Sequence, residues 1–204
     1  MTKREITLAI TGASGAIYGM SLLKYLLSSF DLTHLMISDA GRIVLATELN
    51  LKLPESPSKI VDILTAHFDY ETKKLAVYAK ENWYAPVASG SAAPRQMVIC
   101  PASMGCISAI ANGASNNLLE RAADVVLKEK GQLILLPREM PYSTIHLRNL
   151  TSLSEAGATI MPTSPGFYNK PQKIEDLVDF VCARVLDHLG VNNELSTGWG
   201  YQKK

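Results

Sequence analysis

Several features that define large classes of protein are scarce or missing in this sequence. Its three cysteines, Cys100, Cys106 and Cys182, form no Cys-x-x-Cys pair, which excludes a disulfide framework and leaves too few thiols for a zinc site. Its 20 basic and 19 acidic residues nearly cancel, which argues against nucleic acid or a membrane surface as the main partner. No apolar run reaches the length of a bilayer crossing, and the N-terminal residues show no cleavable leader pattern. We therefore expect a cytoplasmic protein with reduced thiols and no bound metal.

Motifs of several catalytic classes are also missing. The chain has no Gly-x-Ser-x-Gly elbow, no Walker-type loop and no Asp-Asp-x-x-Asp cluster, with which many enzymes acting on diphosphates hold magnesium. Its first glycine-rich turn lacks the G-x-G-x-x-G spacing of dinucleotide-binding folds, although Asp39 stands where a ribose-binding acid would. Tyr70 and Lys74 match a Tyr-x-x-x-Lys pair, but they lie in a polar stretch where a catalytic pair would be misplaced. An NAD-dependent enzyme is therefore disfavoured.

The order of the apolar segments predicts an α/β fold. Short apolar runs such as 6–11 and 132–136 are typical of buried strands, and they alternate with segments of helical period. This alternation predicts a mainly parallel sheet with helices on both faces and ligands at the carboxyl ends of the strands. We expect a single domain over residues 1–204, with a C-terminal tail from about 191 and a turn or flexible loop at 54–58. The predicted strands are 6–11, 32–38, 75–79, 96–100, 132–136 and 158–161, and the predicted helices are 16–28, 40–49, 103–111, 117–130, 143–156 and 174–189.

The first candidate site is the turn that begins at Thr11, between the first strand and the first helix. Its glycines let a ligand approach the backbone closely, and the N–H groups at a helix start favour a phosphate. Ser14 adds a hydroxyl donor. A tight structural turn with Ser14 as the helix N-cap would use the same residues, so both interpretations stay open here.

A second turn, from Cys100 to Cys106, also follows a strand and precedes a helix. Pro101 is expected to start this turn and Ser103 to cap the helix, while the small residues leave room for a flat ligand. A well-capped turn without a ligand is the alternative. Because both turns carry hydroxyl groups and lie at the same edge of the sheet, a ligand shared between them is favoured.

Two basic residues of a later helix form the third candidate. Arg121 and Lys128 lie seven residues apart, and therefore on one helix face, where they could bind a phosphate. An ion pair between Asp124 and Lys128 on a solvated face is the ordinary alternative.

The last candidates lie near the final strands. Arg138 and Glu139 stand between two prolines directly after a buried strand, where a ligand-contacting residue and an acid or base are expected. Tyr168 and Arg184 could both reach an anion. A packed aromatic ring and a surface arginine would give the same pattern.

Together these segments closely resemble the flavin prenyltransferase family. RAADVVLKE followed by PRE is quite specific, whereas GASG alone would not be. Position 102 is Ala where many relatives have Cys, which argues against a role for a thiol there. The matching stretches follow the family order and cover nearly the whole chain: ITGASGAIYG, ICPASMG, IANGASNNLLERAADVVLKE, LLPREMP, PTSPGFYNKP and DFVCARVLDHLG.

The resemblance implies a flavodoxin-like (Rossmann-type) three-layer fold in chains that form trimers and then dodecamers. It implies a metal-independent enzyme that joins a dimethylallyl group from dimethylallyl phosphate to N5 and C6 of reduced FMN. The prenylated FMN would serve a downstream decarboxylase, as in ubiquinone biosynthesis or aromatic acid decarboxylation. The residues implied to bind FMN are Gly12, Ala13, Ser14, Ser38, Ser103, Met104, Gly105, Cys106 and Arg138. Those implied to bind dimethylallyl phosphate are Tyr168, Arg184, Arg121 and Lys128.

The resemblance also implies catalytic roles. Glu139, and after it Glu48, match the carboxylates expected to move protons, and Ser14 and Lys128 are expected to assist. Trp199 matches the aromatic residue that closes over the site, and Trp83 is a further candidate wall. Aromatic walls would suit an allylic cation and shield it from water.

Two other functions stay open from the sequence. An FMN-dependent decarboxylase of aromatic acids or cysteine-type substrates would share the fold. The cysteine type usually has an Asn-Thr continuation after the second turn and a histidine, whereas here Met104 and Gly105 follow and none of the four histidines fits. A flavin carrier without catalysis would need the two turns but not the basic and acidic residues named above.

Overall fold

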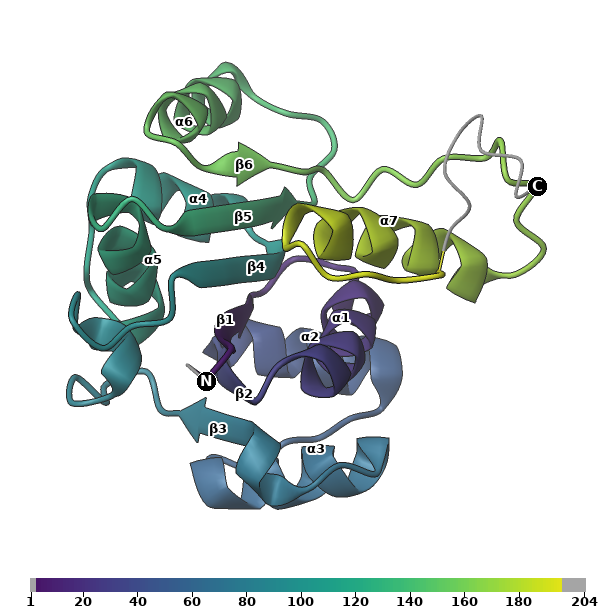
Figure 1. Ribbon diagram of the computed structural model, residues 1–204. Helices are drawn as coiled ribbons and strands as arrows, with labels where there is room; N and C mark the ends of the chain where they lie inside the picture. Colours follow the sequence, from purple (N-terminus) through teal and green to yellow (C-terminus); the bar gives the residue numbers. More distant parts are fainter. Residues whose placement is uncertain (1–2, 196–204) are drawn as a thin grey trace.

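The computed structural model describes residues 3–195 and contains a six-stranded sheet. The strands are β1 (Glu5–Ile10), β2 (Leu32–Ile37), β3 (Leu75–Tyr78), β4 (Gln96–Ala102), β5 (Gln132–Pro137) and β6 (Thr159–Ile160). They are all parallel and lie in the order β3-β2-β1-β4-β5-β6 (Figure 1). The sheet grows outward from the central β1–β4 pair in both directions, which is the arrangement of a doubly wound fold.

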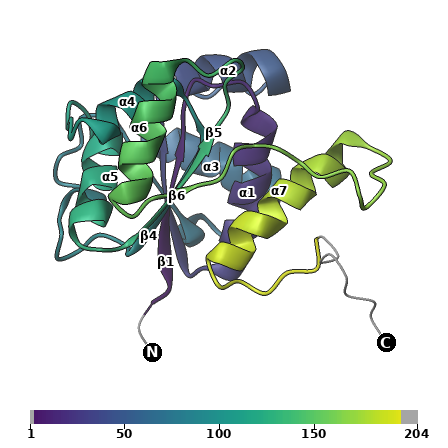
Figure 2. The same cartoon turned by 90° about the horizontal axis from the view of Figure 1, so that it is seen from above.

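Helices cover both faces of this sheet (Figure 2). They are α1 (Ala16–Ser29), α2 (Asp39–Leu49), α3 (Pro57–Phe68), α4 (Met104–Ala111), α5 (Leu118–Lys128), α6 (Thr144–Glu155) and α7 (Ile174–His188), with short 3-10 turns η1 (Thr72–Lys74) and η2 (Pro86–Ala88). One core lies under α1, α2, α3 and α7, and a second core lies under α4, α5 and α6. The predicted three-layer α/β fold with a central parallel sheet is therefore confirmed. Over residues 3–195 we find no helix with the length and apolar character that crossing a membrane requires.

Alternate residues of the central strands serve the two cores. Leu8 and Ile10 of β1 pack in the core under α1 and α7, whereas Ala9 between them packs in the core under α4 and α5. Both sides are apolar, so β4 is buried at nearly every position. This explains why continuous apolar runs, rather than alternating ones, predict these strands.

Two segments differ from the sequence prediction. The region 54–58 is predicted to be a turn or flexible loop, yet α3 begins at Pro57. Proline is tolerated in a first helical turn, and Ile60 and Leu64, four residues apart, are buried against the sheet. β4 continues to Ala102, so Pro101 belongs to the end of the strand and does not start the turn.

Candidate active site

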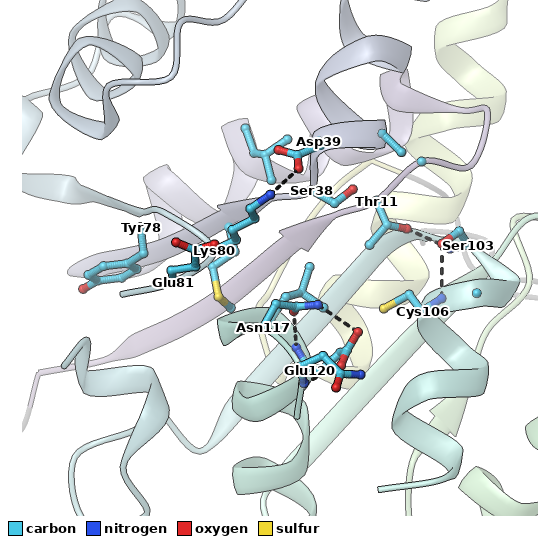
Figure 3. Close-up of a pocket in the computed structure, with 17 residues that line it drawn as sticks. Thr11, Ser38, Asp39, Tyr78, Lys80, Glu81, Ser103, Cys106, Asn117 and Glu120 are labelled. Atoms are coloured by element: carbon cyan, nitrogen blue, oxygen red, sulfur yellow. Dashed lines mark hydrogen bonds and ion pairs between the residues drawn. The ribbon is translucent and has the colours of Figure 1, made fainter. Parts of the chain in front are cut away.

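A cavity of about 500 Å³ opens at the carboxyl ends of β1, β2, β3 and β4. This is the switch point of the sheet, because β1 leads to α1 on one face and β4 leads to α4 on the other. Its volume lies in the range of cofactor and small-molecule sites. The lining residues are Thr11, Gly12, Met36, Ile37, Ser38, Asp39, Ala40, Tyr78, Lys80, Glu81, Ser103, Gly105, Cys106, Asn116, Asn117, Leu119 and Glu120, and Figure 3 shows how their side chains converge.

The two central strands are fastened together at the floor of the cavity. The Thr11 hydroxyl donates to the Pro101 carbonyl at 2.7 Å and accepts from the Ser103 amide, also at 2.7 Å. Ser103 then serves as the N-cap of α4, where its hydroxyl accepts from the Cys106 amide at 3.4 Å. The prediction that Ser103 caps this helix is confirmed. The β4–α4 turn therefore presents a capped helix start to the cavity.

Small residues keep this part of the cavity open. A Cβ atom added to Gly12 would lie 2.3 Å from Cβ of Ala40, so the β1–α1 turn and α2 meet closely at a position that needs glycine. A Cβ added to Gly105 would meet nothing within 4 Å, because Gly105 faces open space. Ser38 at the start of α2 is the N-cap of that helix and accepts from the Gly41 amide at 3.0 Å.

The β1–α1 turn is built differently from its predicted forms. Gly15 is the N-cap of α1, with a φ of 105°, so Ser14 does not cap this helix. The first amides of α1 are already bound by a carboxylate, since Glu48 of α2 accepts from Gly15 at 2.9 Å and from Ala16 at 2.8 Å. In this structure a side chain thus occupies the donors that the sequence assigns to a phosphate.

The environment of Glu48 favours its ionised form. Partial burial raises the pKa of this carboxyl group. Hydrogen bonds from the Ser14 hydroxyl and from the two backbone amides, together with the charge of Arg138, outweigh burial. The pKa of Glu48 therefore lies below its ordinary value.

Arg138 connects the end of β5 to the same turn. Its Nε donates to the Ser14 carbonyl at 3.0 Å, so Ser14, Glu48 and Arg138 form one cluster beside the cavity. Glu139 is the next residue; it is exposed, and its carboxylate accepts from the Met140 amide at 3.3 Å. These four predicted site residues thus lie at the carboxyl edge of the sheet, although the lining of the cavity does not include them.

The predicted flavin-binding residues fall into three groups, of which Ser14 and Arg138, in the cluster beside the cavity, form one. Gly12, Ser38, Ser103, Gly105 and Cys106 line the cavity. The side chains of Ala13 and Met104 are buried, and Met104 packs in the core under α4 and α5, so only the backbones of these two residues remain for ligand contact.

Sequence reasoning did not predict the charged wall of the cavity. Lys80, two residues after β3, bonds to Asp39, the first residue of α2, at 2.7 Å. This contact raises the pKa of Lys80 and lowers that of Asp39, so both groups stay charged. Asp39, considered above as a ribose-binding acid, instead holds a lysine. The signal that could have found Lys80 is its place just after a strand at the carboxyl edge.

The opposite wall comes from the start of α5. The Asn117 side chain accepts from the Glu120 amide at 3.0 Å, and the Glu120 carboxylate accepts from the Asn116 amide at 2.8 Å. Burial, with a smaller effect of Glu120, raises the pKa of the Cys106 thiol to about 12. Cys106 is therefore a neutral thiol in this cavity, and no thiolate is available there at neutral pH.

Arg121 and Lys128 lie away from the cavity. Arg121 donates from Nε to the Ala88 carbonyl at 3.2 Å and pairs with Asp124 at 2.9 Å, while Lys128 pairs with Glu129. The alternative interpretation, an Asp124–Lys128 pair, is wrong in its partners, because Asp124 pairs with Arg121. Nine residues of helix separate Lys128 from the cavity-lining residue Leu119, a rise of about 14 Å. Both cations face the segment around η2, which confirms that they share one face of α5.

Tyr168 and Arg184 are associated with α7. The ring of Tyr168 packs edge-on against Phe180, with 5.6 Å between the ring centroids. Arg184 lies one helical turn after Phe180 and pairs with Asp187 at 2.8 Å. α7 covers the face of the sheet that carries α1, and neither residue lines the cavity.

An aromatic residue that was not predicted contributes to the wall of the cavity. Among the cavity-lining residues within 3–195, the aromatic side chain is that of Tyr78, which sequence reasoning missed. Its hydroxyl bonds to Nδ1 of the buried His34 at 2.8 Å. Trp83 lies in the turn just beyond Glu81, is 46% exposed and does not line the cavity. Trp199 lies outside the described residues.

The fold and the cavity define an α/β protein whose switch point suits a small phosphate-bearing ligand, and comparisons with known proteins agree. The flavoprotein family model matches residues 1–186. The flavin prenyltransferase UbiX of Pseudomonas aeruginosa is 51% identical over 198 residues, which span 97% of this chain and 95% of that protein. The chain therefore belongs to the flavoprotein family and, within it, to the flavin prenyltransferases.

Solved structures extend the likeness to three dimensions. The structure of AnUbiX in complex with FMN and dimethylallyl pyrophosphate has a TM-score of 0.86 and 36% identity, covering 99% of this chain and 100% of that one. A dodecameric FMN-dependent UbiX-like decarboxylase from Escherichia coli has a TM-score of 0.82 and 35% identity, covering 97% and 100%. The resemblance stated from the sequence motifs is thereby confirmed.

Proposed function

We propose that this protein is a flavin prenyltransferase that joins a dimethylallyl group to N5 and C6 of reduced FMN. The observation that carries the proposal is the cavity at the β1–β4 switch point, lined by the residues of the flavin-binding motifs, in a chain of this family. The product would be prenylated FMN, released for use by a partner decarboxylase. FMN is then a substrate of the enzyme rather than a resident group.

The volume and the lining residues of the cavity support the binding of FMN. The glycine at position 12 allows close approach of the backbone, and Gly105 leaves space above the first turn of α4. Hydroxyl groups of Ser38 and Ser103 stand at two helix starts, where phosphate and ribityl oxygens are readily bound. We assign the flavin-binding role to these four residues and Cys106, to the backbones of Ala13 and Met104, and to Ser14 and Arg138 beside them.

The reaction needs a leaving group, a nucleophile and a proton acceptor. The allylic C–O bond of dimethylallyl phosphate breaks, phosphate leaves with the electron pair, and the allylic carbon bonds to N5 of the reduced flavin. The reduced flavin loses its N5 proton in this step. The prenyl double bond then takes up a proton at its middle carbon, the tertiary carbon beside it bonds to C6 and closes a ring, and C6 releases its proton. We assign the acceptance of this proton to Glu139, and the position of its exposed carboxylate at the carboxyl edge beside Arg138 supports this role. Glu48, ionised at the start of α1, is the second candidate.

We propose that several copies of the chain complete one site. Arg121 and Lys128 on α5, Tyr168 and Arg184 at α7, and Trp83 lie on surfaces outside the cavity. A cation aimed at a departing phosphate must reach the reacting atoms, so neighbouring copies would have to supply some of these side chains. Assembly of trimers into a dodecamer is the arrangement that we propose, and a dodecameric relative of known structure supports it.

The proposal also covers the domain organisation of the chain and its location in the cell. We propose that residues 1–204 form one flavoprotein domain with a tail from about 191, because strands from both halves of the chain share one sheet. We also propose a cytoplasmic location, supported by three cysteines that are all free thiols.

The test is an anaerobic turnover experiment. Purified protein is mixed with reduced FMN and dimethylallyl phosphate, and the flavin is weighed by mass spectrometry. We expect a flavin heavier by one C5 prenyl unit, and Glu139→Gln should retain FMN but form the product at a rate lower by about 100-fold or more. Unmodified FMN from folded, flavin-bound wild-type protein would contradict the proposal and favour a decarboxylase or a carrier. Unchanged turnover in Glu139→Gln would remove that residue from the mechanism.

A further inference from the structure

The charges around the cavity are unequal in a way that the family motifs do not explain. Among its lining residues within 3–195, Lys80 is the cation, whereas Asp39, Glu81 and Glu120 are carboxylates. Glu120 is engaged with the backbone and side chain of the Asn116–Asn117 pair. A phosphate entering this cavity therefore meets Lys80 as the positively charged side chain of the wall.

The order of the strands brings the Lys80 side chain next to the start of α2. β2 and β3 are neighbours, with Met36 opposite Tyr78 in the register, so the residues that follow them lie side by side. Ser38 caps α2 and Asp39 is its first residue, and Lys80 reaches this point from beyond β3. Figure 3 shows the Lys80 ammonium beside Asp39, with Ser38 adjacent, over the cavity.

Breaking the Lys80–Asp39 ion pair should cost little free energy. The side chains of Lys80 and Asp39 are 56% and 61% exposed, and an ion pair so open to water adds little to stability. A phosphate dianion at the start of α2 would offer Lys80 a stronger partner than one carboxylate, because charge-assisted bonds to phosphate are strong. Asp39, close to the same phosphate, would then oppose its binding by repulsion.

We infer that Lys80 is a specificity-determining residue which binds the phosphate of FMN and separates FMN from riboflavin, while Asp39 holds Lys80 over the cavity until the phosphate arrives. This rests on the proposed function, because it presumes that the cavity receives FMN. It adds a residue that no flavin-binding motif of the sequence contains. In a plain surface ion pair Lys80 would not contact the flavin phosphate, and its loss would leave the ratio of the FMN and riboflavin dissociation constants unchanged.

The test compares two flavins in matched variants. Dissociation constants for FMN and riboflavin are measured at low salt for wild type, Lys80→Gln and Asp39→Asn. Lys80→Gln should weaken FMN by about tenfold and leave riboflavin unchanged, because riboflavin lacks the phosphate. Asp39→Asn should tighten FMN by a few fold, since the repulsion is gone and Lys80 is free to turn. Lys73→Gln, which removes the cation of the exposed Lys73–Glu71 pair, is the control for net charge and should change neither constant.

The outcomes separate this inference from the proposed function. If wild type binds both flavins and Lys80→Gln weakens them equally or not at all, or if Asp39→Asn weakens FMN, the inference is wrong and the proposed function stands. Wild type that is folded but binds neither flavin would overturn the proposed function, and the inference with it.

Discussion

The two turns at the centre of the sheet are similar in sequence but differ in construction. The β4–α4 turn caps its own helix, because the hydroxyl of Ser103 binds the Cys106 amide. The β1–α1 turn has Gly15 as its N-cap and receives its anion from another helix, through Glu48. Both turns contain serine and glycine. Of the two, only the β4–α4 turn leaves its helix start open to the cavity, since within residues 3–195 the carboxylate of another helix binds the β1–α1 turn alone. A turn whose sequence favours phosphate binding can therefore have its backbone amides occupied by a carboxylate of the same protein.

We propose that the two turns have separate tasks. The Ser103 turn and the start of α2 at Ser38 border the cavity directly. The Ser14 turn presents its backbone carbonyl to Arg138 and its amides to Glu48, and so it positions charged groups at the rim. The first arrangement suits binding, and the second suits the handling of a proton or a leaving group.

The glycines of the two turns give the largest expected contrast. Gly12→Ala should lower the free energy of unfolding by about 1–3 kcal/mol, because the new Cβ would lie 2.3 Å from Cβ of Ala40. Gly105→Ala should leave it unchanged or raise it by about 0.5 kcal/mol, because that Cβ meets nothing within 4 Å in the first turn of a helix. Urea unfolding at one fixed protein concentration measures both. Equal losses in the two variants would contradict the close approach at Gly12.

The Glu48 carboxylate, which binds the first amides of α1, makes the stability of the β1–α1 turn depend on pH. The pKa of Glu48 is lowered, so the stabilisation is fully present above the ordinary value of 4.5 and is lost as the pH falls through the folded value. Glu48→Gln should lower the free energy of unfolding by about 1 kcal/mol at pH 7, a modest loss because water screens the exposed carboxylate.

That difference between wild type and Glu48→Gln should shrink as the pH falls below 4.5 and through the lowered folded value, because the Glu48 carboxyl group then becomes as uncharged as the amide. Denaturation across a series of pH values checks it. A difference that stays constant down to pH 3 would mean that the charge of Glu48 does not stabilise α1.

The smallest difference in the free energy of unfolding is expected between variants of Ser103 and Ser14. Ser103→Ala should lower the free energy of unfolding by about 0.5–1 kcal/mol through loss of the α4 cap, whose bond is long at 3.4 Å. Ser14→Ala should lower this free energy by less than about 0.5 kcal/mol, because Ser14 is exposed, caps no helix and supplies one of several hydrogen bonds to the Glu48 carboxylate. Thermal unfolding of the pair under one set of conditions suffices. A larger loss for Ser14→Ala would mean that its contact with Glu48 stabilises the fold more than the Ser103 cap does.

The sequence predicts features that depend on near neighbours better than those that depend on distant ones. Buried strands such as β5 and the cap at Ser103 follow from apolar runs and adjacent residue types. α3 was missed because Pro57 looks like a breaker, although it sits in the first turn, where proline is tolerated. The cap at Gly15 depends on a carboxylate 33 residues away, and the contact of Lys80 with Asp39 depends on strand order.

The site residues show the same limit. The turn residues that line the cavity follow from their positions just after strands, which is a local signal. Arg121 and Tyr168 were expected near the same ligand, but in one chain they lie at η2 and at α7. Spacing along a helix predicts a shared face correctly and carries no information on which ligand, or which neighbouring copy, that face meets.

The central claim is that the cavity at the β1–β4 switch point receives the flavin, and a crystal structure of the protein with FMN tests it most directly. We expect the flavin between the Gly12 turn, Ser38 and the Ser103 turn, with its phosphate within hydrogen-bonding distance of Ser38 or Lys80. A flavin bound elsewhere, for example on the Arg121–Lys128 surface with this cavity filled by solvent alone, would contradict the account.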